Sequence, residues 1–294
     1  MSIPETQLDS WSAQGAVTNS VNTHSYIRNA LDAHSWPQGM NYQIYLQGSY
    51  ANSTNIRGDS DVDVVADCTS IFYSNLNDEE KQRLGLQAGS HSFADFRREV
   101  IAALANYRDR SRVDPSGANA IEVMPPANSN RLKADVLASV TYKRYDGLKV
   151  IAEGLTFWNQ QNQQQIINYP KLHIRNGEQK NANGRTNGWY KQSIRMFKNA
   201  RTRIIDGKDD LRKRFPSYFV ECLFYNVPDR YFGYSFQRTY TQAVEHLAKA
   251  LSDDTATKLT TQSGQHWLFG TSSIQWQLDN AKDFISRMIR LWGS

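Results

Sequence analysis

The sequence predicts an α+β protein with strands in its first part and a helical C-terminal lobe. Two observations support this fold class. The predicted strands all lie within residues 41–177, whereas almost every segment after residue 188 repeats its apolar residues at helical spacing. Between the two parts, NGEQKNANGRTNG (176–188) is rich in Gly and Asn, which predicts a loop and a boundary between two lobes.

The composition bounds the class of protein. The 294 residues, of which 39% are apolar, suffice for one large unit or two intimate lobes, and a mean hydropathy of −0.64 indicates a very polar surface. No run of about 18 apolar residues predicts a membrane span, and the N-terminus lacks the basic and apolar regions of a secretory signal. Two cysteines exclude a disulfide scaffold and a zinc set, so a cytoplasmic location is expected. A net charge of +5 is compatible with the binding of nucleotides or RNA, but many proteins that bind neither carry a similar charge.

The N-terminal elements follow from apolar spacing. Residues 5–35 show a broken helical period, which predicts one or two helices. NYQIYLQGSY (41–50) alternates apolar and polar residues and predicts a strand that ends at the turn Gly48-Ser49. After the loop ANSTNIRGDS, residues 60–68 predict a second strand with valines on one face and carboxylates on the other.

The next elements carry clearer end signals. Residues 78–85 predict a short helix that Gly85 stops, and HSFADFRREVIAALANYR (91–108) predicts a longer helix with a capping box made by Ser92 and Asp95. Two strands, in AIEVMPP (120–126) and RLKADVLASV (131–140), are expected to follow.

The middle of the chain is expected to contain a polar surface connection, FWNQQNQQQ (157–165), and then a renewed strand, IINYPKLHIRNG (166–177), that carries His173. The later segments are predicted to be helices at WYKQSIRMFKNARTRII (189–205), SYFVECLFYN (217–226), FQRTYTQAVEHLAKAL (236–251) and SIQWQLDNAKDFISRMIRLW (273–292).

The segment QGSYANSTNIRGDSDVDVV (47–65) carries the chemistry. Asp61 and Asp63 lie two apart on a strand and share a face, and such close carboxylates repel each other unless a cation lies between them. Magnesium prefers hard oxygen ligands, and two such ions about 4 Å apart can stabilise both the attacking and the leaving oxygen of a phosphoryl transfer. Backbone N–H groups and the hydroxyl at Gly48-Ser49 can donate to phosphate oxygens. Together these features predict a site for a nucleoside triphosphate.

A calcium site of the EF-hand type is excluded. Counted from Asp59, the sixth and twelfth loop positions hold Val64 and Ser70, where that loop requires Gly and Glu. Asp59 itself is expected to be a turn residue.

Gly48-Ser49, a short loop and then Ser60-Asp61-Val62-Asp63-Val64 resemble the signature of the DNA polymerase beta-like nucleotidyltransferases. The resemblance implies a third acid on a neighbouring strand. Asp135 is a single carboxylate among apolar residues in RLKADVLASV, a rare placement without a partner. It is therefore the expected general base for a ribose hydroxyl or ligand of a second metal ion, with Glu122 as its competitor.

Further segments resemble one branch of that superfamily, the bacterial enzymes related to cyclic GMP–AMP synthase and 2′-5′ oligoadenylate synthase (CD-NTases). The segments are Gln47-Gly48-Ser49-Tyr50, YPKLHIRNGEQKN (169–181), YKQSIRMFKNAR (190–201) and FPSYFVECLFYNVP (215–228). The resemblance implies a core with a mixed sheet, a helical C-terminal lobe and an active site in the cleft between them. It divides the chain into an N-terminal helical segment packing across both lobes (1–36), a nucleotidyltransferase core (37–182) and the helical lobe (183–294).

The resemblance also implies roles for single residues. Asp61, Asp63 and Asp135 would hold two Mg²⁺ ions, with Mn²⁺ as a possible substitute. The implied nucleotide-binding residues are Gln47, Gly48, Ser49 on the triphosphate, Lys198 and Ser217 on the donor phosphates, and Tyr218 stacked on a base. Lys191 lies two helical turns before Lys198 on the same face, so which lysine contacts phosphate is left open.

The implied activity is the joining of nucleoside triphosphates, ATP and/or GTP, into a cyclic dinucleotide or trinucleotide with release of pyrophosphate. The implied setting is bacterial anti-phage signalling through a product-activated effector encoded nearby. Two alternatives stay open. A template-independent RNA-terminal or oligoadenylate-type transferase would need a continuous basic groove, and an inactive nucleotide- or RNA-binding module would not need the complete acid set. The six scattered histidines form no Cys/His cluster, so no site for double-stranded DNA is expected.

Overall fold

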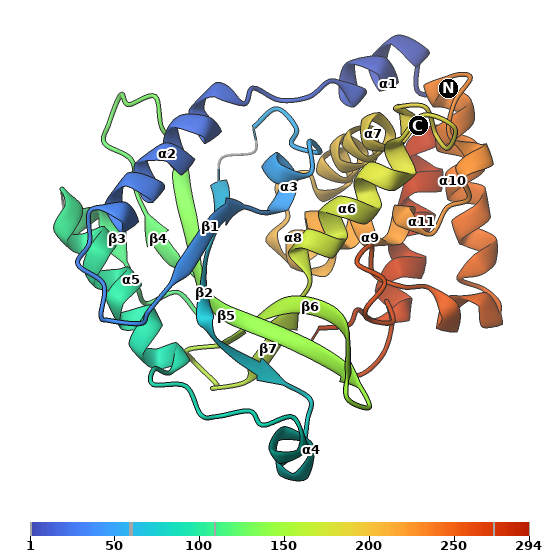
Figure 1. Cartoon of the computed structure of the whole chain (residues 1–294). Coiled ribbons are helices and arrows are strands. Elements are labelled where there is room, and N and C mark those ends of the chain that lie inside the picture. Colours follow the sequence, from blue (N-terminus) through green and yellow to red (C-terminus); the bar gives the residue numbers. More distant parts are fainter. Residues whose placement is uncertain (1, 59–60, 109, 273, 294) are drawn as a thin grey trace. The chain divides into compact units, whose positions relative to one another are not determined.

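The computed structural model describes residues 2–58, 61–108, 110–272 and 274–293. The chain forms two compact units (Figure 1). The sheet unit comprises Val17–Tyr50 and Ser60–Pro170, and the helical unit comprises Met1–Ala16, Ala51–Asp59 and Lys171–Ser294. The main boundary therefore lies at residues 170/171, whereas 182/183 was expected, and the N-terminal segment divides between the units after residue 16.

The sheet unit contains one mixed sheet with the order β1-β2-β5-β4-β3, in which β6 pairs with both β5 and β7. Its strands are β1 (Tyr42–Leu46), β2 (Asp61–Ser74), β3 (Val113–Asp114), β4 (Ile121–Val123), β5 (Lys133–Asp146), β6 (Lys149–Trp158) and β7 (Gln165–Asn168). Strands β2 and β5 are parallel, and the other pairs are antiparallel. The mixed sheet expected from the resemblance is confirmed.

Helices α2 and α5 contact each other and pack on the sheet, as Figure 1 shows. The helical elements of this unit are α2 (Thr18–Asp32), α3 (Gly48–Ala51), α4 (Asp78–Arg83), α5 (Phe93–Tyr107) and the 3-10 turn η1 (Arg110–Arg112). The capping box predicted for α5 is present, because the Ser92 side chain accepts from the Asp95 N–H and the Asp95 side chain accepts from the Ser92 N–H. Gly85 follows α4 with φ +64°, which confirms the predicted stop.

The helical unit has a separate apolar core made by its longer helices. Its elements are α1 (Glu5–Ser12), α6 (Pro170–Asn181), α7 (Trp189–Ile205), α8 (Asp209–Arg214), α9 (Ser217–Tyr225), α10 (Phe236–Ala250), α11 (Leu278–Gly293) and the 3-10 turns η2 (Asp229–Tyr231) and η3 (Asp254–Lys258). The predicted helical C-terminal lobe is confirmed. No helix in the described part of the chain is both long and apolar enough to cross a membrane.

The predicted strand over 166–177 is wrong beyond Asn168, because residues 170–181 form helix α6. A proline at the first helical position favours this start, and the loop expected from residue 176 begins only after Asn181. The buried positions of α6 are His173, Gly177 and Lys180, which follow helical spacing without being apolar. An apolar period therefore could not reveal the helix, and His173 is a helical residue.

Two smaller expectations also change. The polar connection predicted for 157–165 is shorter, since Phe157 and Trp158 complete strand β6 and Gln165 begins β7. The Gly48-Ser49 turn is a single helical turn, α3.

Candidate functional site

The three predicted acids lie on two adjacent strands of the sheet unit. Asp61 and Asp63 are on β2, and Asp135 on β5 is the register partner of Asp63 in a parallel pair. Val62 and Val64 alternate with the two acids and are fully buried in the core beneath the strand. This burial fixes the strand's rotation, so the predicted common face of Asp61 and Asp63 is confirmed.

The turn before the carboxylate strand packs directly on one of its acids. Gly48 has φ +66°, and a Cβ added there would lie 2.0 Å from Asp63 Oδ2. The backbone N–H of Gln47 donates to the Asp63 carbonyl oxygen at 3.0 Å. Only glycine fits this position without displacing the carboxylate, and Ser49 follows it half-buried on α3.

A lysine that the sequence reasoning missed lies within the acid cluster. Lys133 Nζ is 3.2 Å from Asp135 Oδ1 and 3.5 Å from both Asp61 Oδ2 and Glu122 Oε1. Lys133 precedes Asp135 by two residues on β5, so the same alternation that paired Asp61 with Asp63 contained the signal. Glu122 on β4 is the register partner of Asp135 on its other side.

The electrostatics of the cluster show an excess of negative charge. Burial raises the pKa of Asp135, the ammonium of Lys133 opposes that rise, and Asp61 and Glu122 add to it. Burial also works against the charge of Lys133, but its three acidic neighbours prevail and raise its pKa. The single ammonium of Lys133 thus contacts three carboxylates.

The acids fit magnesium by their chemistry. Hard carboxylate oxygens in excess over lysine are the donor set that Mg²⁺ prefers, and the missing Cβ of Gly48 leaves room for the Asp63 carboxylate. Within the described ranges, no three His, Cys, Asp or Glu side chains already form a closed metal-ligand group. Lys133 provides the positive charge that lies between Asp61 and Asp135 in this arrangement.

The remaining predicted residues belong to the helical unit. Ser217 and Tyr218 occupy the first turn of α9, and Tyr218 is 46% exposed. Its ring contacts those of His173 and Trp276, with centroid distances of 5.2 and 5.6 Å. A partly exposed tyrosine that is held by two aromatic neighbours is suited to stacking on a base.

The two candidate lysines of α7 differ in their partners. Lys191 pairs with Glu178, whose side chain is 57% exposed, whereas Lys198 pairs with the buried Glu221. The Lys198 side chain itself is only 1% exposed, and its ammonium also donates to the Thr54 carbonyl oxygen at 3.1 Å. The structure therefore separates two lysines that the sequence left equivalent.

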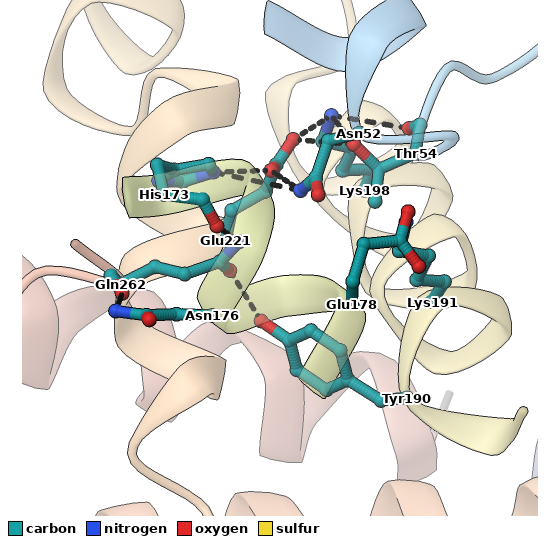
Figure 2. A network of polar contacts seen from close by, with 10 residues as sticks. All are labelled: Asn52, Thr54, His173, Asn176, Glu178, Tyr190, Lys191, Lys198, Glu221 and Gln262. Carbon is teal, nitrogen blue, oxygen red and sulfur yellow. Dashed lines mark hydrogen bonds and ion pairs between the residues drawn. The ribbon is translucent and has the colours of Figure 1, made fainter. Parts of the chain in front are cut away.

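Figure 2 shows the polar network around Glu221, a residue that was not predicted from the sequence. Thr54 Oγ1 donates to Glu221 Oε1 at 2.7 Å, Asn52 Nδ2 donates to Oε2 at 2.8 Å, and His173 Nε2 lies 3.2 Å from Oε2. Burial opposes ionisation of Glu221, but Lys198 and His173 outweigh it and hold the pKa of the carboxyl well below its usual range. Asp59 and Ser60, at the far end of the same loop, lie outside the described residues.

The chain is similar to known proteins over nearly its full length. The family model for the cGAS/DncV-like nucleotidyltransferase C-terminal helical domain matches residues 175–293. The cyclic UMP-AMP synthase of Rhodothermus marinus is 43% identical over 298 residues, which cover 99% of this chain and 98% of that protein.

Solved structures agree with the sequence comparison. The Rhodothermus marinus CdnE c-UMP-AMP synthase with Apcpp and Upnpp matches with a TM-score of 0.90 and 42% identity, over 99% of this chain and 97% of that one. The Elizabethkingia meningoseptica CdnE cyclic dinucleotide synthase with GTP and Apcpp matches with a TM-score of 0.81 and 28% identity, over 99% and 100% of the two chains.

Proposed function

We propose that this chain joins nucleoside triphosphates into a cyclic dinucleotide and releases pyrophosphate. The chain belongs to the bacterial cGAS/DncV-like nucleotidyltransferases (CD-NTases). The observation that carries the proposal is the group of acids at the end of the sheet where the adjacent strands β2 and β5 begin, the carboxylate edge. Asp61, Asp63 and Asp135 lie there, and Gly48 keeps the preceding turn against Asp63. This is the arrangement that a phosphoryl transfer needs, in a chain that resembles cyclic nucleotide synthases over 99% of its length.

The sheet unit would carry the chemical step. Asp135 takes the proton of the acceptor ribose hydroxyl, whose oxygen attacks the α-phosphorus of the donor. A new phosphodiester bond forms as the bond to pyrophosphate breaks, and a second transfer closes the ring. Magnesium held by Asp61, Asp63 and Asp135 would supply positive charge to the phosphate oxygens. The backbone of Gln47 and Gly48 and the Ser49 hydroxyl would hold the triphosphate.

The helical unit would hold the donor nucleotide. Tyr218 offers its exposed ring to the base, and Ser217 offers a hydroxyl at the start of α9 to the phosphates. Lys191 is the better phosphate lysine, because its present partner Glu178 is exposed and can return to water when phosphate replaces it. The same exchange at Lys198 would leave the Glu221 carboxylate buried without its cation.

The proposed bases come from the names of the relatives. Since the Rhodothermus marinus protein is named for cyclic UMP-AMP, ATP and UTP are the first substrate pair to test. The structure named with GTP and Apcpp keeps the pair of ATP and GTP as the alternative. The proposed setting is anti-phage signalling in the bacterial cytoplasm, where the product activates an effector encoded nearby.

The test is a product assay. Purified protein is incubated with all four nucleoside triphosphates and Mg²⁺, treated with phosphatase and analysed by mass spectrometry, with Asp61→Asn/Asp63→Asn as the size-matched control. A phosphatase-resistant cyclic dinucleotide that is absent from the control and from a chelator-treated sample supports the proposal and identifies the bases. Exclusively linear oligomers, or extension of added RNA, would replace it with a terminal-transferase activity.

A further inference from the structure

The loop between the phosphate turn and the carboxylate strand is unusually buried. Residues 51–58 belong to the helical unit, although the chain on both sides of them belongs to the sheet unit. Asn52, Thr54 and Asn55 are fully buried, whereas connecting loops normally run over the surface. Ser53 has φ +55°, a conformation that a non-glycine residue keeps only where its surroundings enforce it.

The helical unit enforces this conformation through backbone contacts. Arg195 Nη1 donates to the Ser53 carbonyl oxygen at 2.7 Å, and Lys198 Nζ donates to that of Thr54 at 3.1 Å. Helix α6 approaches the loop so closely that a Cβ on Gly177 would lie 2.8 Å from Asn52 Oδ1. The loop is therefore held from α7 and from α6.

Glu221 joins these contacts in one buried centre (Figure 2). Its two oxygens accept from the side chains of Asn52 and Thr54, and the same carboxylate pairs with Lys198. Glu221 lies one helical turn after Tyr218 on α9, and the His173 ring that contacts Glu221 also lies against the Tyr218 ring. One carboxylate thus ties the loop to the ring proposed to stack on the base.

We infer that Glu221 and Lys198 are positioning residues that hold the Asn52–Asn55 loop, and through it Ser49, in the arrangement needed for nucleotidyl transfer. The inference rests on the proposed function, since it gives these residues a part in the same reaction. Ser49 lies three residues before Asn52 in the same segment of the chain, so order in the loop limits the freedom of Ser49. A displacement of about 1 Å in a reacting group can cost on the order of 100-fold in rate.

The test uses three variants, one at each of three residues that contact one another in the network. Thr54→Val removes the hydroxyl that donates to Glu221 while preserving shape, Glu221→Gln removes the charge, and Lys198→Met removes the cation. Each is expected to lower kcat by about tenfold or more and to leave KM for the nucleotides nearly unchanged, because residues that orient the reacting groups without touching substrate commonly contribute about 10- to 100-fold.

A matched control separates positioning from stability. Lys180 is another buried lysine of the helical unit, and among the described residues its ammonium bonds to the Val227 carbonyl oxygen and to Asp229 at 2.9 Å, not to the loop. Lys180→Met should lower the melting temperature comparably and leave kcat of the folded enzyme unchanged. If Glu221→Gln fails to fold, Thr54→Val tests the same contact from the loop with a smaller change.

A readout independent of catalysis keeps the inference separate from the proposed function. Hydrogen exchange of the nucleotide-free protein should show faster exchange of amides 52–56 in Thr54→Val and Glu221→Gln, and unchanged exchange in Lys180→Met. Unchanged loop exchange would overturn the inference even if product forms. It would also be overturned if Thr54→Val and Glu221→Gln kept normal kcat while Lys198→Met raised KM alone, since Lys198 would then be a phosphate ligand. Absence of product from the unmodified protein would count against the proposed function only.

Discussion

The carboxylate edge of the sheet unit and the Glu221 network of the helical unit combine the same residue types with different charge balance. At the edge, Lys133 lies within 3.5 Å of three acids whose side chains are 28–46% exposed. In the network, Glu221 and Lys198 neutralise each other, and their side chains are only 5% and 1% exposed. The carboxylate edge carries surplus negative charge that solvent can reach, whereas the charges of the Glu221 network balance each other and are buried.

This difference teaches how to tell a reactive site from a structural one when both contain ion pairs. Surplus charge is unfavourable for the folded protein and is retained where a cation or a charged substrate will compensate it. A balanced buried pair needs no ligand, and removal of either partner leaves an uncompensated charge. Substitutions should therefore change stability in opposite directions in the two regions.

The largest expected effect is at the edge. Asp61→Asn/Asp63→Asn should abolish product formation, by about 1000-fold or more, because the variant loses the charge that holds the metal. It should also melt at the same temperature or higher in metal-free buffer, since carboxylate repulsion is relieved. Activity and thermal denaturation in chelator check both signs, and a clear loss of metal-free stability would contradict the comparison.

Lys198→Met should have the largest effect on stability, about 3–5 kcal/mol near neutral pH, because it leaves Glu221 buried and unpaired. In the unmodified protein the pKa of Glu221 is held low, so its stabilising contribution is complete above the unfolded value and is lost as pH falls below it. In the variant, burial dominates and raises that pKa, so protonation relieves the deficit. Urea unfolding near pH 7.5 and near pH 5.5 should show a smaller deficit at the lower pH, and a constant deficit would refute this account.

Gly48→Ala tests how closely the turn packs on the carboxylate strand. The new Cβ would meet Asp63 Oδ2 and adopt a positive φ, so a loss of about 1–3 kcal/mol in stability and a strong loss of activity are expected. Gly39→Ala is the matched control, because Gly39 also has a positive φ, +81°, but has nothing within 4 Å of an added Cβ. Equal activity loss in both variants would mean that backbone strain, and not the contact with Asp63, is responsible.

Lys133→Met should act oppositely to Lys198→Met. Lys133 Nζ competes with a metal ion for Asp61 and Asp135, so its removal should tighten binding of Mg²⁺ or Mn²⁺ several-fold in calorimetric titrations. Lys81→Met, at an exposed pair on α4, is the control and should leave metal affinity unchanged. Weaker metal binding by Lys133→Met would show that the lysine supports the site.

The sequence revealed much of the edge because its signals are local. Alternation on one strand placed Asp61 and Asp63 together, and a single acid in an apolar strand indicated Asp135, now seen in register with Asp63. The same alternation on β5 relates Lys133 to Asp135, two residues apart on one face. The α5 capping box was equally readable, since both of its residues lie within one turn.

The Glu221 network could not be predicted in this way. Its hydrogen bonds join residues 167 and 169 positions apart, and no periodicity relates Thr54 or Asn52 to Glu221. Helix α6 was missed for a related reason, because polar residues and a glycine occupy its buried positions, where an apolar pattern is normally sought. Polar burial is determined by tertiary partners, and the sequence contains no local record of them.

The smallest expected effect uses the two cysteines as internal reporters, one in each unit. Cys68 on β2 and Cys222 on α9 are both buried, and burial together with the neighbouring Glu221 raises the pKa of Cys222 to about 12. Neither thiol should react appreciably with a thiol reagent near pH 8 in the native protein, because both side chains are buried and the reagent cannot reach them. In low urea, Glu221→Gln should increase labelling of Cys222 and leave that of Cys68 unchanged, as measured by peptide mass spectrometry. An equal increase at both cysteines would show that the network stabilises the sheet unit as well, and the contrast between the two regions would then hold for their chemistry but not for their stability.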